Sequence, residues 1–553
     1  MFLQTENRWS LIELQNMNAM NNNFFGYKNL QNRHLKMIFK IPALLTIFFY
    51  SNTIYAQPLI EWQQAYGGSD YDESRSIHQT RDGNYFVAGI TGSNDGDVEA
   101  NHGYTDFWVL KLDELGVVLW KKIYGGSDLD DALSSHSTTD GGLVVAGFTR
   151  SNDGDVSGNH GDSDAWIIKL DSVGGIEWQK CLGGSGWEEA WDVQQTIDGG
   201  YIVAGLSGSI DGDVTVNHGS LDYWIVKLSS AGNIEWQKSL GGSLLDIAYS
   251  INQTNDGGYI VAGESNSPDG DVTNIHGNFD YWVVKLNFEG KIEWQKTLGG
   301  TNLDRANEVQ QTKEGGYIVL GQARSNNGDV TGGHGGYDYW IVKLTNTGEF
   351  EWQRSLGGSG EDYGRHVQQT KDDGYIITGQ TQSNNGDVLG NDGGADIWVV
   401  KLMNGGEIQW QKSLGGSQAE IGFFIQQTND EGFILSGSAW SNNGDVSGVQ
   451  GKTDFWIVKL SPESSPTTAL QFSPLQIFPN PAQQSISLQI PTQETSANVI
   501  ISDLLGRECS RQTISIPELS AESLTITALY PGFYLVTATT SAGKVFSGKF
   551  RKE

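Results

Sequence analysis

The chain has 553 residues, of which 72 are glycine and only 11 are proline. It is too long for one ordinary compact domain unless it is a repeat array or a large β ring. The formal net charge of −31 repels phosphate and argues against nucleic acid as a partner. The two cysteines, Cys181 and Cys509, fall in different parts of the chain, which excludes a disulfide framework.

Residues 37–56 have the pattern of a signal peptide. Lys36 and Lys40 supply a positive start, a short apolar run follows, and the segment ends in a small-residue cleavage site at Ala56. The run is too short for a spanning helix, so we predict no transmembrane segment in the mature chain. Residues 1–36 precede a better start at Met37 and are interpreted as a mis-assigned or disordered extension.

Seven copies of one 58-residue unit follow, and the tryptophans mark them. The first tryptophan series is Trp62, Trp120, Trp178, Trp236, Trp294, Trp352 and Trp410, and the second is Trp108, Trp166, Trp224, Trp282, Trp340, Trp398 and Trp456. Each unit holds four short runs of β-branched and aromatic residues separated by turn residues, which is typical of strands. Four-stranded units of this length indicate propeller blades rather than the short coils of a β-solenoid.

The ends of the array predict a closed ring. The chain enters on the run around Trp62, which is the fourth strand of a unit, and leaves on the run around Trp456, which is the third. Segment 59–66 can therefore complete the last blade and remove an exposed sheet edge. We predict an all-β fold with a seven-bladed β-propeller over residues 57–460.

A loop of the type Ser-Asn-Asp-Gly-Asp-Val, followed by another aspartate, recurs in every unit. Spaced Asp and Asn oxygens around a glycine turn can bind Ca²⁺, which makes Ca²⁺ a possible cofactor. The same residues also satisfy loop N–H groups as Asx turns, and this second role is favoured because no copy matches an EF-hand loop. The candidate Ca²⁺ ligands are Asp95, Asp97, Asp106, Asp153, Asp155, Asp164, Asp211, Asp213, Asp222, Asp269, Asp271 and Asp280.

A second acidic series follows a Gly-Gly-Ser or Gly-Gly-Thr turn and leads into the expected innermost strand. In a propeller both acidic series would gather on one face, where a rim of carboxylates could bind cations or a basic ligand. Alternatively, each acid bonds to nearby backbone N–H groups. The acidic rim candidates are Asp72, Asp130, Glu188, Asp246, Asp304, Asp362 and Glu420.

No catalytic residue is assigned from the sequence. A nucleophile elbow, a phosphate-binding loop, a paired zinc motif and a dinucleotide-binding glycine pattern are all missing from it. A near-perfect repeat also argues against an enzyme, since a catalytic site needs asymmetry. Two or three unrepeated carboxylates in one pocket would favour an enzyme. Trp187, Trp191 and Trp440 break the repeat, and they either stack on sugars or pack between blades.

After a polar linker at 461–470, residues 471–553 alternate short strands and turns, which predicts a small β-sandwich. Its motifs are Phe478 to Ala482, Asp503 to Arg507, Leu529 to Tyr534, and Gly548 to Phe550. In this order they resemble the type A C-terminal sorting domain of type IX secretion substrates. The matching motif residues include Pro479, Asn480, Pro481, Asp503, Gly506, Gly532 and Tyr534.

The resemblance implies export through the periplasm, the type IX secretion machinery as a partner, and a secreted or cell-surface location, by a route used in Bacteroidota. The repeat region resembles uncharacterised propeller repeats of such secreted proteins, which adds fold and location only. We therefore expect a non-catalytic binding or adhesion protein for a glycan or surface protein. The alternatives are a polysaccharide-acting hydrolase or lyase with carboxylates at the propeller mouth, and a structural surface protein.

Overall fold

The computed structural model describes residues 57–463, 473–489, 496–503, 508–515, 522–540 and 544–553. The predicted signal peptide, the 1–36 extension and most of the linker lie outside these residues. The described residues form strands and turns in two parts, the repeat region and the C-terminal domain. They include no helix long and apolar enough to cross a membrane.

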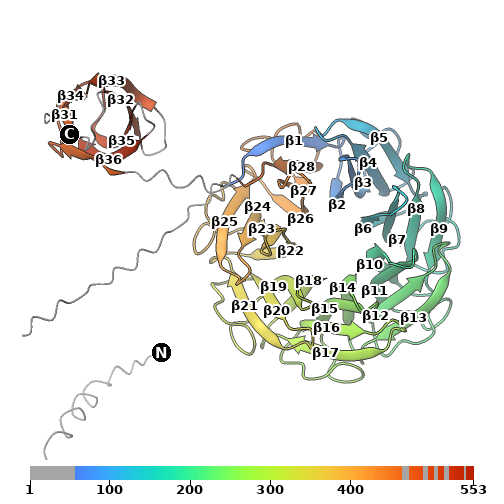
Figure 1. Ribbon diagram of the computed structural model, residues 1–553. Coiled ribbons are helices and arrows are strands. Elements are labelled where there is room, and N and C mark those ends of the chain that lie inside the picture. The colour runs from blue at the N-terminus through green and yellow to red at the C-terminus, as the bar shows by residue number, and fades with distance from the viewer. Residues whose placement is uncertain (1–56, 464–472, 490–495, 504–507, 516–521, 541–543) are drawn as a thin grey trace, which may run out of the picture. The chain divides into compact units, whose positions relative to one another are not determined.

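The repeat region forms seven four-stranded antiparallel sheets arranged in a ring (Figure 1). The innermost strands are β2 (Asp72–Gln79), β6 (Asp130–Ser137), β10 (Glu188–Gln195), β14 (Asp246–Gln253), β18 (Asp304–Gln311), β22 (Asp362–Gln369) and β26 (Glu420–Gln427). The second strands are β3 (Tyr85–Thr91), β7 (Leu143–Thr149), β11 (Tyr201–Ser207), β15 (Tyr259–Ser265), β19 (Tyr317–Ala323), β23 (Tyr375–Thr381) and β27 (Phe433–Ala439).

The outer half of each blade is built in the same way. The third strands are β4 (Asp106–Leu112), β8 (Asp164–Leu170), β12 (Asp222–Leu228), β16 (Asp280–Leu286), β20 (Asp338–Leu344), β24 (Asp396–Leu402) and β28 (Asp454–Leu460). The outermost strands are β5 (Val118–Tyr124), β9 (Ile176–Leu182), β13 (Ile234–Leu240), β17 (Ile292–Leu298), β21 (Phe350–Leu356), β25 (Ile408–Leu414) and β1 (Ile60–Tyr66).

The first strand of the described residues closes the ring, as the sequence predicts. Strand β1 pairs antiparallel with β28, with Ile60 opposite Leu460 and Tyr66 opposite Phe455. The sheet order is β1-β28-β27-β26, so the seventh blade joins both ends of the repeat region. The fold is therefore an all-β, seven-bladed propeller whose closing sheet leaves no blade incomplete.

Aromatic side chains of the third strands bind neighbouring blades together. The ring of Tyr281 lies 4.5 Å from the ring of Trp340 in the next blade, and its hydroxyl donates a 2.9 Å hydrogen bond to the Trp340 carbonyl. The seven third-strand tryptophans are almost completely buried. Because both faces of this strand are covered, the side chains on both of its faces are mostly apolar.

The third strand also buries a lysine, which the neighbouring turns neutralise. Lys285 bonds to Asp256 at 3.0 Å and to Glu293 at 3.1 Å. Asp256 belongs to the turn between the first two strands of the same blade, and its bonds, including those from Thr254 and Lys285, lower its pKa to about 2 against burial. A buried ammonium needs such partners, so this pair is part of the scaffold.

The C-terminal domain has two sheets around one core. The five-stranded sheet has the order β29-β36-β35-β32-β33 and the three-stranded sheet the order β30-β31-β34. The strands are β29 (Ser473–Pro474), β30 (Gln476–Phe478), β31 (Ser485–Gln489), β32 (Ser496–Asp503), β33 (Glu508–Ser515), β34 (Glu522–Thr525), β35 (Gly532–Thr540) and β36 (Val545–Lys552). Ile486, Val499, Val536 and Phe550 meet in the core, which gives the predicted sandwich.

Candidate binding site in the central channel

Each innermost strand contains a β-bulge at the same position. In the first blade, Ser74 pairs with Gly89 and Ser76 pairs with Ala88, so Arg75 has no partner across the ladder. A bulge redirects the side chain of the extra residue and often lies beside a functional site. The seven bulged residues are Arg75, Leu133, Trp191, Tyr249, Asn307, Arg365 and Phe423.

A glycine in the second strand makes room for the bulge. In the second blade, a Cβ on Gly147 would overlap the carbonyl oxygen of Asp131, just before the bulge. The equivalent glycines of the other blades make the same close approach to the innermost strand. The glycine that recurs in every second strand is therefore required by the close approach of two backbones.

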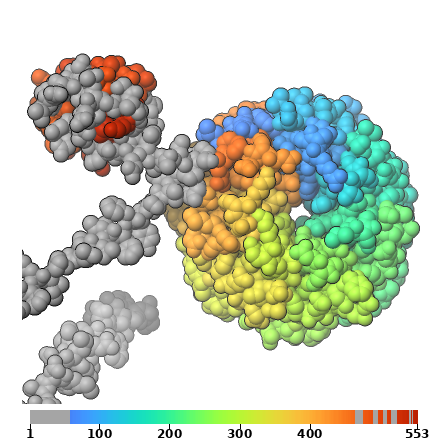
Figure 2. Space-filling view, viewed as in Figure 1, coloured from blue at the N-terminus to red at the C-terminus, as the bar shows by residue number. Residues whose placement is uncertain are grey.

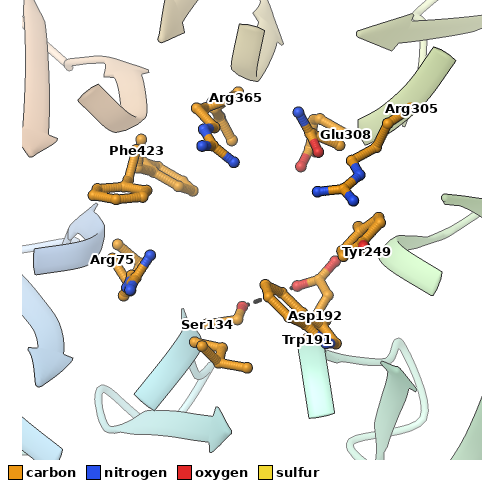
Figure 3. Close-up of a pocket in the computed structure, with 14 residues that line it drawn as sticks. Arg75, Ser134, Trp191, Asp192, Tyr249, Arg305, Glu308, Arg365 and Phe423 are labelled. Carbon is orange, nitrogen blue, oxygen red and sulfur yellow. Dashed lines mark hydrogen bonds between the residues drawn. The ribbon is translucent and has the colours of Figure 1, made fainter. Parts of the chain in front are cut away.

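The bulged residues converge on a cavity of about 160 Å³ in the central channel. Figure 2 shows the ring hollowed at its centre, and Figure 3 shows these side chains around the opening. All seven bulged residues line the cavity, and so do their neighbours Ser76, Ser134, Asp192, Glu308, His366 and Phe424. A scaffold of repeated blades thus presents a different side chain from each blade at one site.

Aromatic rings cover part of this wall. The rings of Trp191 and Tyr249 meet edge to face, with centroids 5.0 Å apart. The Arg75 guanidinium lies 4.4 Å from the centroid of the Phe423 ring. Such faces can stack on a sugar ring or another flat group.

Two unrepeated carboxylic acids, Asp192 and Glu308, lie on the same wall. Asp192 accepts hydrogen bonds from the Ser134 hydroxyl and the Ile251 N–H, both at 2.9 Å. Burial raises the pKa of Asp192 to about 6 against these bonds. Burial also raises the pKa of Glu308 well above its ordinary value, and the charge of Asp192 adds to that shift. Burial therefore shifts both groups toward their protonated forms.

Three arginines surround the same cavity, but only two of them have acidic partners. Arg75 pairs with Glu73 at 2.8 Å, and Arg305 makes a forked pair with Glu264 at 2.8 and 2.9 Å. Arg365 forms no ion pair within the described part of the chain, and its Nε is buried without a hydrogen-bond partner there. Burial lowers the pKa of Arg365 to about 10, so it still carries a charge at neutral pH.

A second cavity of about 250 Å³ continues the channel. It shares Asp192 and Glu308 with the first cavity, so these acids lie where the two meet. Its remaining wall is mostly amide and imidazole: His78, His136, Gln194, Asn252, Gln310, Gln368 and Gln426. Burial lowers the pKa of His78 to about 3. This part of the channel is therefore polar, but His78 adds no positive charge to it at neutral pH.

The predicted acidic rim is not an exposed rim. All seven of its carboxylates are fully buried. Asp72, for example, accepts bonds from the Gly68 N–H and the Ser93 hydroxyl, both at 2.8 Å, and from the Thr91 hydroxyl. The innermost strand begins at this acid, which places it beneath the Gly-Gly turn rather than on the surface. The acids therefore bond locally to backbone and hydroxyl donors, which is the alternative to a ligand-binding rim.

The Ca²⁺ candidates also bond to the loops around them. Asp95 accepts a 2.7 Å bond from the Ser69 N–H, and Asp106 accepts bonds from the N–H and the Nδ1 of His102. No group of three or more acidic, histidine or cysteine side chains in the described residues has the geometry to hold a metal ion. Ca²⁺ binding therefore remains a prediction without structural support.

The irregular tryptophans do not act as one group. Trp191 lines the channel, whereas Trp187 lies half-exposed in the turn before β10, where its indole N–H bonds to Glu189. Trp440 follows β27. Sequence reasoning singled out Trp191 but missed the other channel residues. Aligning the seven copies would have found them, because the bulge position reads Arg, Leu, Trp, Tyr, Asn, Arg and Phe.

The sorting motifs fall at strand ends of the C-terminal domain. Pro479, Asn480 and Pro481 follow β30, and Asn480 bonds to the backbone of Lys549 and Arg551. Asp503 ends β32, Gly532 begins β35, and Gly506 lies outside the described residues. The Tyr534 hydroxyl donates to the Tyr530 carbonyl at 2.9 Å, and its ring stacks on Phe550.

Comparison with known proteins assigns this C-terminal part. Residues 476–550 match the family described as the secretion system C-terminal sorting domain. The chain carries a type IX sorting domain. This sorting domain indicates export, with the type IX machinery as a partner and a final location outside the cell or on its outer surface. No curated protein matches the sequence.

Solved structures resemble the chain only in general architecture. The extracellular domain of a putative hybrid two component system from B. thetaiotaomicron is 11% identical over 87% of this chain and 61% of that one, with a TM-score of 0.37. Puromycin hydrolase is 9% identical over 76% and 59%, with a TM-score of 0.41. A GH43_12 protein from a capybara gut metagenome is 11% identical over 91% and 92%, with a TM-score of 0.28.

This chain therefore spans about three fifths of the first two proteins. Likenesses this distant say nothing about its ligand.

Proposed function

We propose that this is a secreted or cell-surface binding protein of the non-catalytic, adhesion type, and that it takes its ligand in the central channel. One observation carries the proposal: the seven bulges place different side chains around one cavity, while the blades that hold them are nearly identical. A concave site with aromatic faces and a few polar groups is the usual form of a small-ligand site. Export would begin with the signal peptide at 37–56.

The repeated polar residues of the surrounding scaffold have structural roles. The recurring acids bond to Gly-Gly turns, and five of the seven recurring lysines pair with turn aspartates. These contacts stabilise each blade and need no ligand. Function is therefore sought where the copies differ, in the channel wall.

The proposal is tested by carbohydrate and protein arrays probed with the full chain and two tryptophan variants. Trp191→Ala removes an aromatic face from the channel, and Trp187→Ala removes an exposed tryptophan outside it. We expect the channel variant to lose at least about tenfold in affinity for any ligand found, since stacked aromatic contacts of this kind dominate binding sites. The Trp187 variant should bind normally. Equal binding by all three proteins would refute a channel site.

A second candidate function is supported by Asp192 and Glu308. They are two unrepeated carboxylic acids in one channel, with raised pKa values, and such groups can serve as general acid and base. A secreted hydrolase or lyase acting on polysaccharide would use them in this way. Release of new reducing ends or unsaturated products from a polysaccharide panel, lost in both Asp192→Asn and Glu308→Gln, would establish this alternative. Product release that both variants retain would reject these roles.

A further inference from the structure

We propose that the channel recognises an acidic sugar unit, a single uronic-acid-type ring whose carboxylate binds the Arg365 guanidinium. This inference rests on the proposed function and names the ligand class for the same site. Its basis is the contrast among the three channel arginines, the size of the cavity, and the polar groups on its wall.

Arg365 is the channel cation that the protein leaves open to a ligand. Glu264 occupies the fork of Arg305 through two bonds. Glu73 pairs with one Nη of Arg75, whose Nε also has no partner among the described residues, whereas Arg365 has no acidic partner there at all. Arg365 lies against the Phe423 ring at 5.8 Å and points toward the middle of the opening (Figure 3). Its buried Nε has no partner among the described residues. Because a buried donor without a partner is costly, and arginine binds carboxylates through two parallel bonds, the geometry fits an incoming carboxylate.

The first cavity has room for one ring. Its volume of about 160 Å³ is below the roughly 300–1,000 Å³ usual for drug-sized ligands. A cavity of about 150 Å³ holds a single six-membered ring such as benzene. One sugar residue at the end of a chain therefore fits the first cavity, and a second residue would extend into the adjoining cavity of about 250 Å³.

The rest of the wall matches the remainder of a sugar ring. Trp191 and Tyr249 offer aromatic surface for the face of the ring. Ser134, Asn307, Asp192 and Glu308 line the same cavity with polar atoms that can bond to ring hydroxyls. Burial raises the pKa of Glu308 well above its ordinary value, which weakens its repulsion of a carboxylate compared with an exposed glutamate. A peptide carboxylate would satisfy Arg365 but leaves these hydroxyl partners unused.

Titration calorimetry with the full chain tests this inference. The probes are oligogalacturonides, neutral galacto-oligosaccharides of the same length, and short peptides with a free carboxylate. Arg365→Met keeps the length of the side chain and removes the charge, Arg365→Lys keeps the charge without the fork, and Arg81→Met is a control at an exposed arginine. We expect wild-type protein to prefer the acidic sugars. Arg365→Met should lose about tenfold or more in affinity for them, since hydrogen bonds to charged groups are strong.

The outcomes separate this inference from the proposed function. The inference is supported if the wild type binds acidic sugars more tightly than the other probes, if both Arg365 variants lose this binding, and if the Arg81 control keeps it. The melting temperature of the variants should be unchanged. Preference for neutral sugars, with binding that needs Trp191 but not Arg365, overturns the acidic ligand and leaves the channel site standing. Preference for the peptides overturns the sugar class. Binding of acidic sugars that is independent of both Trp191 and Arg365 overturns the inference and the channel site together.

Discussion

Substituting Asp454 tests whether the charge of a buried acid in the propeller lowers its stability. Asp454 Oδ1 and Asp72 Oδ2 come from strands of adjacent blades and face Gly67, where a Cβ would lie 2.6 and 2.7 Å from the two oxygens. Asp454 Oδ2 accepts a 2.8 Å bond from the Gln450 N–H, but its buried Oδ1 has no partner among the described residues. The same open oxygen occurs in the six equivalent aspartates.

The charge on this group opposes folding at neutral pH. Burial, with a smaller contribution from Asp72, raises the pKa of Asp454 from 3.8 to about 6. A folded pKa above the unfolded one gives stability that is fully present below pH 3.8 and lost as the pH rises through about 6. Two pKa units correspond to at most about 3 kcal/mol. The pKa is also raised to about 6 at Asp106, Asp280, Asp338 and Asp396.

We therefore expect the melting temperature to rise as the pH falls from 7.5 to 5. Below pH 4 it should fall again, because the turn aspartates paired with lysine, such as Asp256, then become protonated and lose their pairs. Asp454→Asn keeps the bond from Gln450 and directs an N–H₂ group toward Asp72. It should stabilise the protein at pH 7.5 by about 1–3 kcal/mol and reduce the gain on acidification.

Calorimetric melting at pH 7.5 and 5, with and without a chelator, measures this effect. Asp72→Asn is a poor control because it disturbs the Gly68 turn, so the exposed Asp373→Asn serves instead. A lower melting temperature for Asp454→Asn at pH 7.5 would refute the reasoning. If the chelator also destabilised the wild type but not this variant, the pair would hold a cation and the Ca²⁺ prediction would be right.

Three further changes have defined outcomes. Trp282→Ala empties a fully buried site between blades and should cost about 3–5 kcal/mol in denaturant unfolding, whereas a cost below 1 kcal/mol would contradict the packing. Gly147→Ala should destabilise by about 1–3 kcal/mol or more, because its Cβ would overlap the Asp131 carbonyl; Gly141→Ala, which meets no atom but has φ of 86°, separates overlap from backbone strain. Deleting residues 476–553 should leave the propeller in the periplasm, as cell fractionation would reveal, and continued secretion would show that the sorting domain is dispensable.

The blade architecture could be predicted because its sequence signals report directly on packing. The tryptophans recur where third strands meet neighbouring blades, as with Trp340 against Tyr281. The spacing of buried aromatic residues along the chain is therefore the same as the length of one repeat. The closing strand could be predicted from the same periodicity, since a blade begun at its fourth strand has to be completed elsewhere. Both signals depend only on strand order and apolar pattern.

The channel could not be predicted in the same way. A bulge shifts the alternation of one strand by a residue, so the pattern alone does not reveal that Arg75 and Ser76 both face the cavity. The exposure expected for the acidic rim differs from the structure for a related reason. Asp72 looks like a turn residue in the sequence, yet the strand starts there and the Gly-Gly turn covers it. Both cases depend on local backbone geometry rather than on residue type.

Because the bulged residues line the channel without pairing across the sheet, they can affect ligand binding more than folding stability. A combined substitution tests this. A bulged residue has no cross-strand partner, and Leu133 already shows that leucine is accepted at this position. Changing Trp191, Tyr249, Arg365 and Phe423 together to leucine should abolish ligand binding. It should lower the free energy of unfolding by less than about 5 kcal/mol, because the direct losses are the Trp191–Tyr249 ring contact, the Tyr249 bond to Glu264, and the arginine contacts with the Tyr249 and Phe423 rings. Denaturant unfolding beside the binding assay checks both parts. A loss above about 5 kcal/mol would mean that the channel side chains hold the ring together, and the variation among blades would then have a structural cause.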